Sequence, residues 1–314
     1  MAGHVGHASI RLGGRKRLPR LWNAQSLVWW AGGFDCESGP SHGFSAPRSG
    51  HMALPIRPYA GYMPDENRPT AIVTGGGRGI GAATAIALGA AGYDIAVNFV
   101  ANEAAAARVV EQLAALGSKA VAIRGDVSRE SDILRLFETA ERTLGAVRAL
   151  VNNAGVTGGF ARVDSVESAA LTQVLGVNVA GTILCAREAV KRMSTRRGGR
   201  GGAIVNISSL VTRTGGAGEW VHYAASKGAV NSFTIGLARE VAAEGIRVNA
   251  VAPGLIDTDL HAANGAPDRL ERMTPGIPMQ RPGTADEVAA GVVWLLSDAA
   301  SYVNGAILEI GGGR

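Results

Sequence analysis

From Thr70 onward, short runs of apolar and β-branched residues alternate with longer stretches in which apolar residues recur every three or four positions. The short runs predict buried strands, and the longer stretches predict amphipathic helices. The predicted strands are 70–74, 93–99, 119–126, 148–155, 202–208, 246–253 and 306–310. The predicted helices include Ala-rich patterns at 82–91 and 102–116 and two long patterns at about 165–193 and 223–244.

Strands separated by helices of this length form βαβ units, which place the strands in one parallel sheet and cover both its faces with helices. The expected fold class is therefore α/β: a single doubly wound Rossmann-type domain, residues 63–314, with a mainly seven-stranded parallel sheet. In such a sheet, ligands bind at the carboxyl ends of the strands.

Residues 1–62 are rich in Gly, Arg, His and Pro and show no sustained helical or alternating pattern. The apolar stretch 26–31 is too short for a secretory signal. We expect a disordered basic leader or an over-extended start, with no part in catalysis. A targeting segment is the less favoured alternative, because the helical amphipathicity of a transit peptide is missing.

The net charge of +5 belongs entirely to this leader, which carries seven basic and two acidic residues. The remainder is neutral and has no basic stripe, so nucleic acid is not expected as a partner. No run approaches eighteen apolar residues, which argues against a membrane span. The two cysteines, Cys36 and Cys185, form no metal-ligand spacing and suit a reducing compartment, so we expect a cytoplasmic protein without a Cys-based metal site.

A Gly-rich segment, Thr74 to Gly81, directly follows the first predicted strand and opens a helix. Glycines at 75, 79 and 81 allow a tight turn and close approach to a pyrophosphate, which the N–H groups at the helix start can bind. A Gly-rich turn without a ligand is the alternative. The strand before it and the helix after it favour a dinucleotide site.

Tyr223 and Lys227 are four residues apart on a predicted helix, so they share one face. A tyrosine hydroxyl titrates near about 10, and a neighbouring ammonium lowers that pKa by stabilising the tyrosinate. Such a pair can exchange a proton with a substrate. Taken alone, the pattern is better explained by an exposed tyrosine and an unrelated lysine.

Two further segments end predicted strands where ligands are expected: Asn206 to Ser209, and Asn152 to Gly155. Ser209 would then lie at the carboxyl edge of the sheet. Either asparagine could instead cap the next helix. All four elements occurring in one order make coincidence a poor explanation.

Together these motifs resemble the classical short-chain dehydrogenase/reductase family across essentially all of residues 66–314. The family's TGxxxGxG falls on Thr74–Gly81, its NNAG on Asn152–Gly155 and its YxxxK on Tyr223–Lys227. The segments GAGEWVHYAASKGAV, IPMQR and VVWLLSD resemble the bacterial glucose-1-dehydrogenase-like branch most.

The resemblance implies four catalytic residues. Tyr223 would be the general acid/base, and Ser209 would orient and polarise the substrate oxygen. Lys227 would lower the tyrosine pKa and hold the nicotinamide ribose, and Asn178 would hold a water in a proton relay. The expected cofactor contacts are Thr74, Gly75, Gly77, Arg78, Gly79, Ile80, Gly81, Asn98, Asp126, Val127, Asn153, Ala154, Gly155, Tyr223, Lys227, Pro253, Gly254, Ile256 and Thr258.

The function expected from this resemblance is reversible NAD(P)-dependent interconversion of an alcohol and a ketone or aldehyde on a small molecule, such as a sugar or polyol. Reduction of 3-oxoacyl groups on an acyl carrier protein is the alternative within enzymes. A catalytically inactive dinucleotide sensor is the alternative of another class, but such proteins usually lack the Tyr or Lys that this chain retains. The family also implies a homotetramer.

The chain departs from the commonest family pattern at one place. Ser209 and Tyr223 are fourteen residues apart, where thirteen is commonest, and the extra residue falls within Gly218–His222. This segment is expected to line the substrate pocket. The departure predicts an altered substrate shape rather than a loss of activity.

NADP(H) is expected in preference to NAD(H). An acid at the end of the second strand binds a free ribose 2′-hydroxyl and repels a phosphate. That strand ends Val97-Asn-Phe-Val100 without an acid, and Arg78 in the Gly-rich turn supplies a cation. No Arg or Lys follows Phe99, so the expected preference is moderate.

Four other features receive simpler interpretations. His222 is expected to be a solvated neighbour of Tyr223, and Trp294 and Cys185 are expected to be buried in the core. The basic tract 192–200 is expected to be a solvated loop.

Overall fold

The computed structural model describes residues 68–258, 266 and 268–314. Within them, seven parallel strands form one sheet in the order β3-β2-β1-β4-β5-β6-β7. The strands are β1 Thr70–Val73, β2 Asp94–Phe99, β3 Ala120–Arg124, β4 Val147–Asn152, β5 Gly202–Ile207, β6 Ile246–Pro253 and β7 Ile307–Ile310. The predicted doubly wound sheet is confirmed. The expectation for the leader 1–62 lies outside the described residues.

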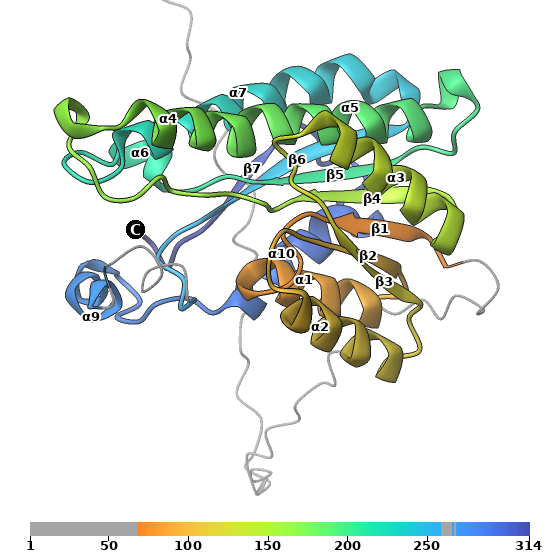
Figure 1. The fold of residues 1–314 in the computed structure, drawn as a ribbon, viewed down its shortest axis with the longest axis horizontal. Helices are drawn as coiled ribbons and strands as arrows, with labels where there is room; N and C mark the ends of the chain where they lie inside the picture. Colours follow the sequence, from red (N-terminus) through yellow and green to blue (C-terminus); the bar gives the residue numbers. More distant parts are fainter. Residues whose placement is uncertain (1–67, 259–265, 267) are drawn as a thin grey trace, which may run out of the picture. The chain divides into compact units, whose positions relative to one another are not determined.

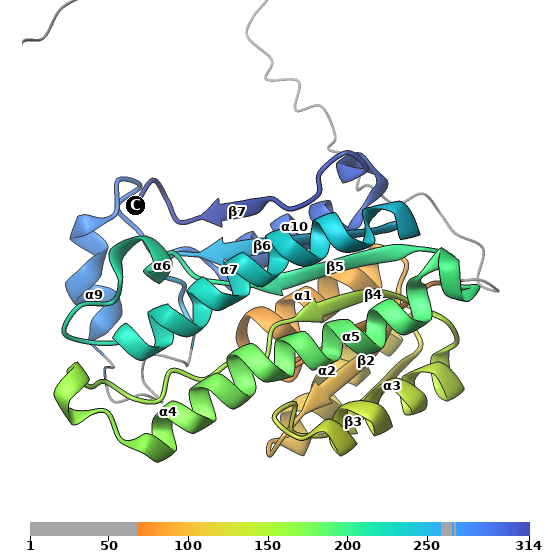
Figure 2. The same ribbon diagram turned by 90° about the horizontal axis from the view of Figure 1, so that it is seen from above.

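Helices cover both faces of the sheet (Figures 1 and 2). The helices on one face are α1 Gly79–Ala90, α2 Glu103–Ala115 and α10 Ala285–Leu296. The helices on the other face are α3 Glu130–Leu144, α4 Ser168–Leu175, α5 Thr182–Met193 and α7 Val221–Val241. Two shorter helices, α6 Val211–Thr214 and α9 Arg269–Met273, lie in the connections near the carboxyl ends of β5 and β6.

The sheet separates two apolar clusters because successive strand side chains point to opposite faces. Ala71 and Val73 of β1 pack with the side that carries α1, α2 and α10, whereas Ile72 packs with the side of α3, α5 and α7. Strands covered on both sides are apolar at nearly every position. This is why the strand signal in the sequence is continuous rather than alternating.

The long helical pattern at 165–193 is one continuous helix with a six-residue π-helical segment, Gly176–Gly181, between α4 and α5. Such π segments are rare and occur frequently at functional sites. The predicted catalytic Asn178 lies at its middle.

The same helix, Ser168–Met193, is long and apolar enough to cross a membrane by length and composition, and 33% of its apolar eighteen-residue stretch is buried. A core helix of this length passes the same test. Its inner face does belong to the core, since Val174, Cys185, Ala186 and Met193 are fully buried. One helix of this kind is therefore weak support for a membrane span.

The expected burial of Trp294 is wrong. Trp294 is 41% exposed, because α10 turns Val288, Val292 and Leu295 toward the core and leaves Trp294 on its outer side. The basic tract is solvated as expected at Arg196, Arg197 and Arg200. The exception is Arg192 at its start, which is mostly buried and pairs with Glu188 at 2.7 Å and Glu141 at 2.8 Å. The expected burial of Cys185 is confirmed.

Candidate functional site

The expected cofactor residues collect at one edge of the sheet, because each group ends or follows a parallel strand. Thr74–Gly81 follows β1, Asn98 is in β2, Asp126 and Val127 follow β3, Asn153–Gly155 follow β4, and Pro253–Thr258 end and follow β6. The Cγ2 atom of Thr258 lies 3.5 Å from where a Cβ of Gly79 would be. The segment after β6 therefore faces the Gly-rich turn.

The Gly-rich turn has the conformation that its glycines make possible. Gly75 has φ +62° and Gly79 has φ +52°, both in the left-handed region. A side chain on Gly81, in the first turn of α1, would overlap the carbonyl oxygen of Gly75 and the side-chain amide of Asn153. Only glycine fits there, and the backbone remains open to a pyrophosphate at the start of α1.

Residues from the end of β4 brace this turn. The Asn153 side chain donates to the carbonyl oxygens of Thr74 at 2.9 Å and Gly75 at 3.0 Å. The Thr74 hydroxyl in turn accepts from the backbone N–H groups of Asn153 and Ala154, each at 3.0 Å. The NNAG segment thus fixes the shape of the turn.

Asn98 braces the turn from the other side. Its Oδ1 accepts from the Gly75 N–H at 3.2 Å, and its Nδ2 donates to the carbonyls of Ile123 at 3.3 Å and Gly125 at 2.8 Å. The side chain is 1% exposed. Asn98 therefore joins the turn to the ends of β2 and β3, and the hydrogen bonds of its side-chain amide are made within the protein.

Arg78 is the exposed N-cap residue of α1. Within the described part of the chain, no carboxylate pairs with its guanidinium. Asp126, at the adenine side of the expected site, accepts from the Ser128 N–H at 2.9 Å and hydroxyl at 2.8 Å. Val127 beside it is buried. Arg78 is thus an unpaired cation on the edge of the sheet that also carries Asp126 and Val127.

The four expected catalytic residues also meet at this edge. Tyr223 lies in the first turn of α7, and the Ser209 side chain just beyond β5 lies close enough to lower its pKa. Lys227, one turn further along α7, donates from Nζ to the Ile207 carbonyl at 2.6 Å. A Cβ placed on Gly155 would be 3.4 Å from both Lys227 Nζ and Asn178 Oδ1. Gly155 is therefore where the lysine and the asparagine converge.

Asn178 is fixed by the π-helical segment and its neighbours. Its Nδ2 donates to the Val156 carbonyl at 2.9 Å and to the Ser226 hydroxyl at 3.0 Å, while its Oδ1 accepts from the Val156 N–H at 2.8 Å. The Ser226 hydroxyl donates to the Tyr223 carbonyl at 2.7 Å. Ser226, which the sequence analysis did not single out, thus links Asn178 to the helix that carries Tyr223.

Burial sets the proton affinities here. It raises the pKa of Tyr223 to about 12, opposed by the hydrogen bond with Ser209, and it lowers the pKa of Lys227 to about 8. That the Lys227 ammonium lowers the tyrosine pKa stays a prediction. Its Nζ lies 5.7 Å from the centroid of the tyrosine ring and is bonded to the Ile207 carbonyl instead.

The two strand-end asparagines do not cap helices. Asn152 and Asn206 are register partners in β4 and β5, and Asn152 Nδ2 donates to Asn206 Oδ1 at 2.9 Å. Asn206 Nδ2 continues to the Thr234 hydroxyl of α7, also at 2.9 Å. This buried polar chain ties β4 and β5 to the catalytic helix.

Aromatic and charged side chains lie beside Tyr223 on the substrate side. The Trp220 ring stacks on Phe160 at a centroid distance of 4.5 Å and meets the Tyr223 ring edge-on at 5.8 Å. The Arg269 guanidinium lies 4.3 Å from the Trp220 ring centroid and pairs with Glu219 at 2.8 Å. Contacts between segments this distant in the chain left no signal in the sequence.

The expectation of a solvated His222 is wrong. The side chain is 6% exposed, and its Nε2 lies 2.8 Å from the Thr157 carbonyl. His222 precedes Tyr223 on α7, and its side chain lies under Gly158, where an added Cβ would be 3.0 Å from its Nε2. It shapes the wall of the site rather than facing solvent.

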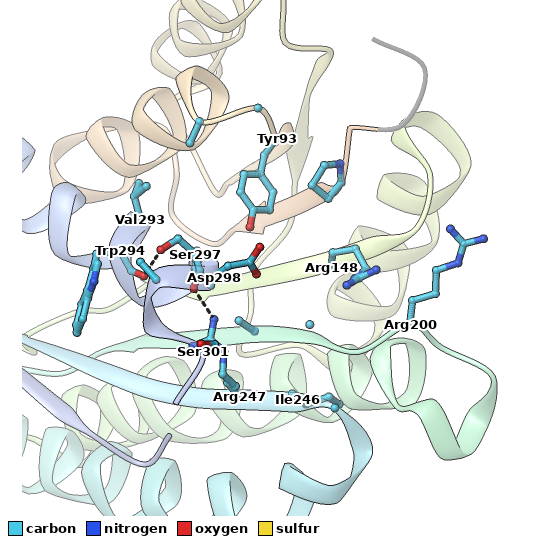
Figure 3. Close-up of a pocket in the computed structure, with 18 of the residues that line it drawn as sticks. Tyr93, Arg148, Arg200, Ile246, Arg247, Val293, Trp294, Ser297, Asp298 and Ser301 are labelled. Carbon is cyan, nitrogen blue, oxygen red and sulfur yellow. Dashed lines mark hydrogen bonds between the residues drawn. The ribbon is translucent and has the colours of Figure 1, made fainter. Parts of the chain in front are cut away.

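A hollow of about 1970 Å³ lies away from Tyr223 and the Gly-rich turn (Figure 3). It is lined by residues at the starts of strands, among them Pro69, Tyr93, Ala146, Gly202 and Ile246. The amino ends of parallel strands lie at the edge opposite Tyr223 and the Gly-rich turn. Trp294 and Tyr302 also line this hollow.

Comparison with known proteins agrees with this geometry. The profile of a family described as enoyl-(acyl carrier protein) reductase matches residues 75–314. The uncharacterised oxidoreductase YgfF of Escherichia coli (strain K12) is 49% identical over 78% of this chain and 99% of its own length. Glucose 1-dehydrogenase 2 of Bacillus subtilis (strain 168) is 37% identical over 78% of this chain and 93% of its own length.

Two further matches bear on the cofactor and the substrate. The 3-oxoacyl-[acyl-carrier-protein] reductase FabG of Staphylococcus epidermidis is 35% identical over 78% of this chain and 98% of its own length. The crystal structure of a short-chain dehydrogenase from Burkholderia cenocepacia J2315, in complex with NADP, superimposes with a TM-score of 0.73 at 34% identity, covering 79% of this chain and 99% of that one. The chain therefore belongs to the short-chain dehydrogenase/reductase family of NAD(P)-dependent oxidoreductases.

Proposed function

We propose that the protein interconverts an alcohol and a ketone or aldehyde on a small hydroxylated substrate, with Tyr223 as general acid/base and NADP(H) as the preferred cofactor. The observation that carries the proposal is the position of Tyr223 on α7, with Ser209 close enough to influence its pKa and Lys227 one helical turn away. This arrangement presents two hydroxyl groups to one substrate oxygen beside the Gly-rich turn.

The residues at the carboxyl edge fit a nicotinamide dinucleotide. The turn at Gly75–Gly81 leaves no room for a side chain at Gly81 and exposes the start of α1, as a pyrophosphate requires. Asp126 and Val127 would hold the adenine, and Asn153–Gly155 with Pro253–Thr258 would hold the nicotinamide half. The bound cofactor would supply or accept the hydride, while the protein supplies positioning and protons.

The proton chemistry follows from the side chains themselves. Tyr223, whose pKa of about 12 keeps it protonated at neutral pH, donates its proton to a developing alkoxide in the direction of reduction. Ser209 orients the same substrate oxygen. Lys227, with a pKa of about 8, can exchange a proton near neutrality.

Asn178 would complete the proton path. Its Oδ1 accepts one hydrogen bond from Val156 and keeps a second lone pair for a water between it and Lys227, since both atoms face the same point near Gly155. This arrangement supports a relay from Tyr223 through Lys227 to solvent.

The preference for NADP(H) rests on the unpaired Arg78 and on Val100, where an acid would favour NAD(H). A charge–phosphate hydrogen bond contributes about 1.5–3 kcal/mol, so the expected preference is about 10- to 150-fold. The test is kcat/KM for NADPH and NADH on one substrate, repeated with Arg78→Ala. A wild-type preference for NADH, or an unchanged ratio in the variant, contradicts the proposal.

Two substrate classes are compatible with the relatives named above. The likeness to a glucose 1-dehydrogenase favours a sugar or polyol, and the likeness to a 3-oxoacyl carrier-protein reductase favours a 3-oxoacyl thioester. A screen following NADPH absorbance, with sugars, polyols and acetoacetyl thioesters in parallel, separates them. We expect the highest kcat/KM with a sugar or polyol, and a preference for acetoacetyl thioesters would favour the second class.

A further inference from the structure

The end of β2 lies between the Gly-rich turn and the end of β3. The Gly76 N–H donates to the Asn98 carbonyl at 2.8 Å, and the Gly125 N–H donates to the Phe99 carbonyl at 2.8 Å. In the parallel register, Phe99 pairs with Arg124, the last residue of β3. Side chains of register partners project from the same face of a sheet. Arg124 therefore projects beside the end of β2, although it is twenty-five residues from Phe99 in sequence.

The Arg124 guanidinium is held at this position. Its Nε donates to the Val100 carbonyl at 3.1 Å, and the backbone carbonyl of Arg124 accepts from Arg135 Nη2 at 3.1 Å. The side chain is exposed. Among the residues that the structure describes, no carboxylate pairs with Arg124, and its two Nη groups make no hydrogen bond. An oriented guanidinium with two free nitrogens is suited to bidentate binding of a phosphate.

In this fold the end of the second strand is where the adenosine ribose 2′ position is recognised. The chain has no base directly after Phe99, but the geometry brings one there from the neighbouring strand. We infer that Arg124 forms, together with Arg78, the site for the 2′-phosphate of NADP(H). The inference rests on the proposed cofactor preference and identifies a residue that strengthens it.

An acidic residue also follows the end of β2 in sequence. Glu103, in the first turn of α2, is exposed and lies two residues after the end of the Phe99–Ala101 segment. Its charge interacts favourably with the amino end of its own helix but repels a phosphate bound beside Val100.

The test is the binding of 2′,5′-ADP and 5′-AMP, which differ only in the 2′-phosphate, measured by calorimetry on the full chain. Arg124→Gln is expected to weaken 2′,5′-ADP binding by about 5- to 50-fold and to change 5′-AMP binding by less than about twofold. The loss should shrink at high salt, because the contact is exposed. The same variant should lower the ratio of NADPH to NADH affinity by a similar factor.

Three further variants separate charge at this position from charge elsewhere. Arg142→Gln, which removes an exposed arginine near the far end of α3, is the matched control and should change neither ligand's affinity. Arg124→Lys should retain part of the 2′,5′-ADP affinity, because it keeps the charge without the fixed fork. Glu103→Gln should tighten 2′,5′-ADP binding and leave 5′-AMP binding unchanged.

The outcomes distinguish this inference from the proposed preference. If Arg124→Gln weakens both nucleotides equally, the residue acts only through its bond to Val100, and the inference is wrong. If Arg78→Ala changes the ratio of the two affinities and Arg124→Gln does not, the preference stands and the inference fails. If the wild-type protein binds 2′,5′-ADP no more tightly than 5′-AMP, the preference itself is wrong.

Discussion

Lys227 donates a 2.6 Å hydrogen bond from its ammonium to the backbone carbonyl of Ile207, the last residue of β5. Ser209 follows two residues later, and Tyr223 lies one turn before Lys227 on α7. The bond therefore joins the strand that positions the serine to the helix that positions the tyrosine. Because Lys227 is 4% exposed, this join is made by a buried charge.

The buried ammonium makes stability depend on pH. Burial lowers the pKa of Lys227 from 10.5 to about 8, so between these values the unfolded chain binds more protons than the folded chain. The free energy of unfolding should therefore rise with pH across this window. Relative to Lys227→Met, the free energy of unfolding of the wild-type protein should increase by about 2–3 kcal/mol between pH 7 and 10.5, as measured by urea unfolding.

Lys227→Met also loses the hydrogen bond to Ile207, but this loss lowers the free energy of unfolding by the same amount at every pH. The change with pH therefore reports on the ammonium alone. Lys119→Met, at an exposed lysine, is the control and should follow the wild-type pH profile. A constant difference between wild type and Lys227→Met from pH 7 to 10.5 would show that the ammonium is not desolvated.

Tyr223→Phe should reduce kcat by at least about 10²–10⁴-fold while leaving the cofactor dissociation constant within about twofold. The substitution removes only the hydroxyl that transfers the proton, and the ring keeps its edge-on contact with Trp220. Steady-state turnover and NADPH fluorescence titration measure the two effects. A variant with most of its wild-type rate would exclude Tyr223 as the general acid/base.

Gly81→Ala should weaken cofactor binding at least about tenfold and lower stability by about 1–3 kcal/mol, because overpacking displaces the backbone. The added methyl group would overlap the Gly75 carbonyl oxygen and separate the turn from Asn153. Gly236→Ala is the matched control, since nothing lies within 4 Å of its added Cβ. The stability of that variant should increase by about 0.5–1 kcal/mol, because alanine has the higher helix propensity, and its cofactor affinity should be unchanged. Normal affinity in Gly81→Ala would mean that the turn adapts.

The sheet was predictable because its strands are buried on both faces, which makes each one a continuous apolar run. The observed strands differ from the predicted ranges mainly at their ends. Residues 153–155, predicted in a strand, instead turn to brace Thr74 and Gly75. Periodicity could not reveal the π-helical segment around Asn178, because the contacts of that side chain with Val156 and Ser226 join segments that are distant in the chain.

The site was predictable where its residues share a short motif and unpredictable where distant segments meet. Tyr223 and Lys227 are one helical turn apart, and this spacing became a prediction once the Gly-rich turn and the two strand-end motifs stood beside it in the family order. Arg269 reaches Glu219 across fifty residues, and Arg124 reaches Val100 across a strand pairing. No basic residue directly follows Phe99 in the sequence, so the sequence did not indicate that Arg124 lies there.

A chain beginning at Met63 should keep its fold and its kcat/KM within about twofold, since segments of this composition bury little apolar surface. The described core begins at Thr70. Arg68 precedes it and donates to the Gly89 carbonyl at 2.7 Å and the Gly117 carbonyl at 3.0 Å, so the shortened chain retains this anchor. Circular dichroism and kcat/KM compare the two lengths. Insolubility or inactivity of the shorter chain would show that residues 1–62 are structural.

Two exposed apolar surfaces support the prediction of a homotetramer. Leu171, Leu175 and Ile183 are 38–42% exposed along the helix Ser168–Met193, and Trp294 and Tyr302 are 41% and 100% exposed beside the hollow of Figure 3. Each surface would form an isologous interface, and two such interfaces generate a tetramer. Light scattering should therefore give four times the mass of one chain at micromolar concentration.

Charged substitutions can separate the two interfaces. Leu175→Glu and Trp294→Glu should each reduce the assembly to a dimer, because a carboxylate buried in an apolar interface without a partner is strongly unfavourable. The two changes combined should give a monomer. Leu116→Glu, at an equally exposed leucine after α2, lies on neither surface and should leave the tetramer intact. A wild-type protein that scatters as a single chain would contradict the prediction, and a tetramer unaffected by either substitution would place its interfaces elsewhere.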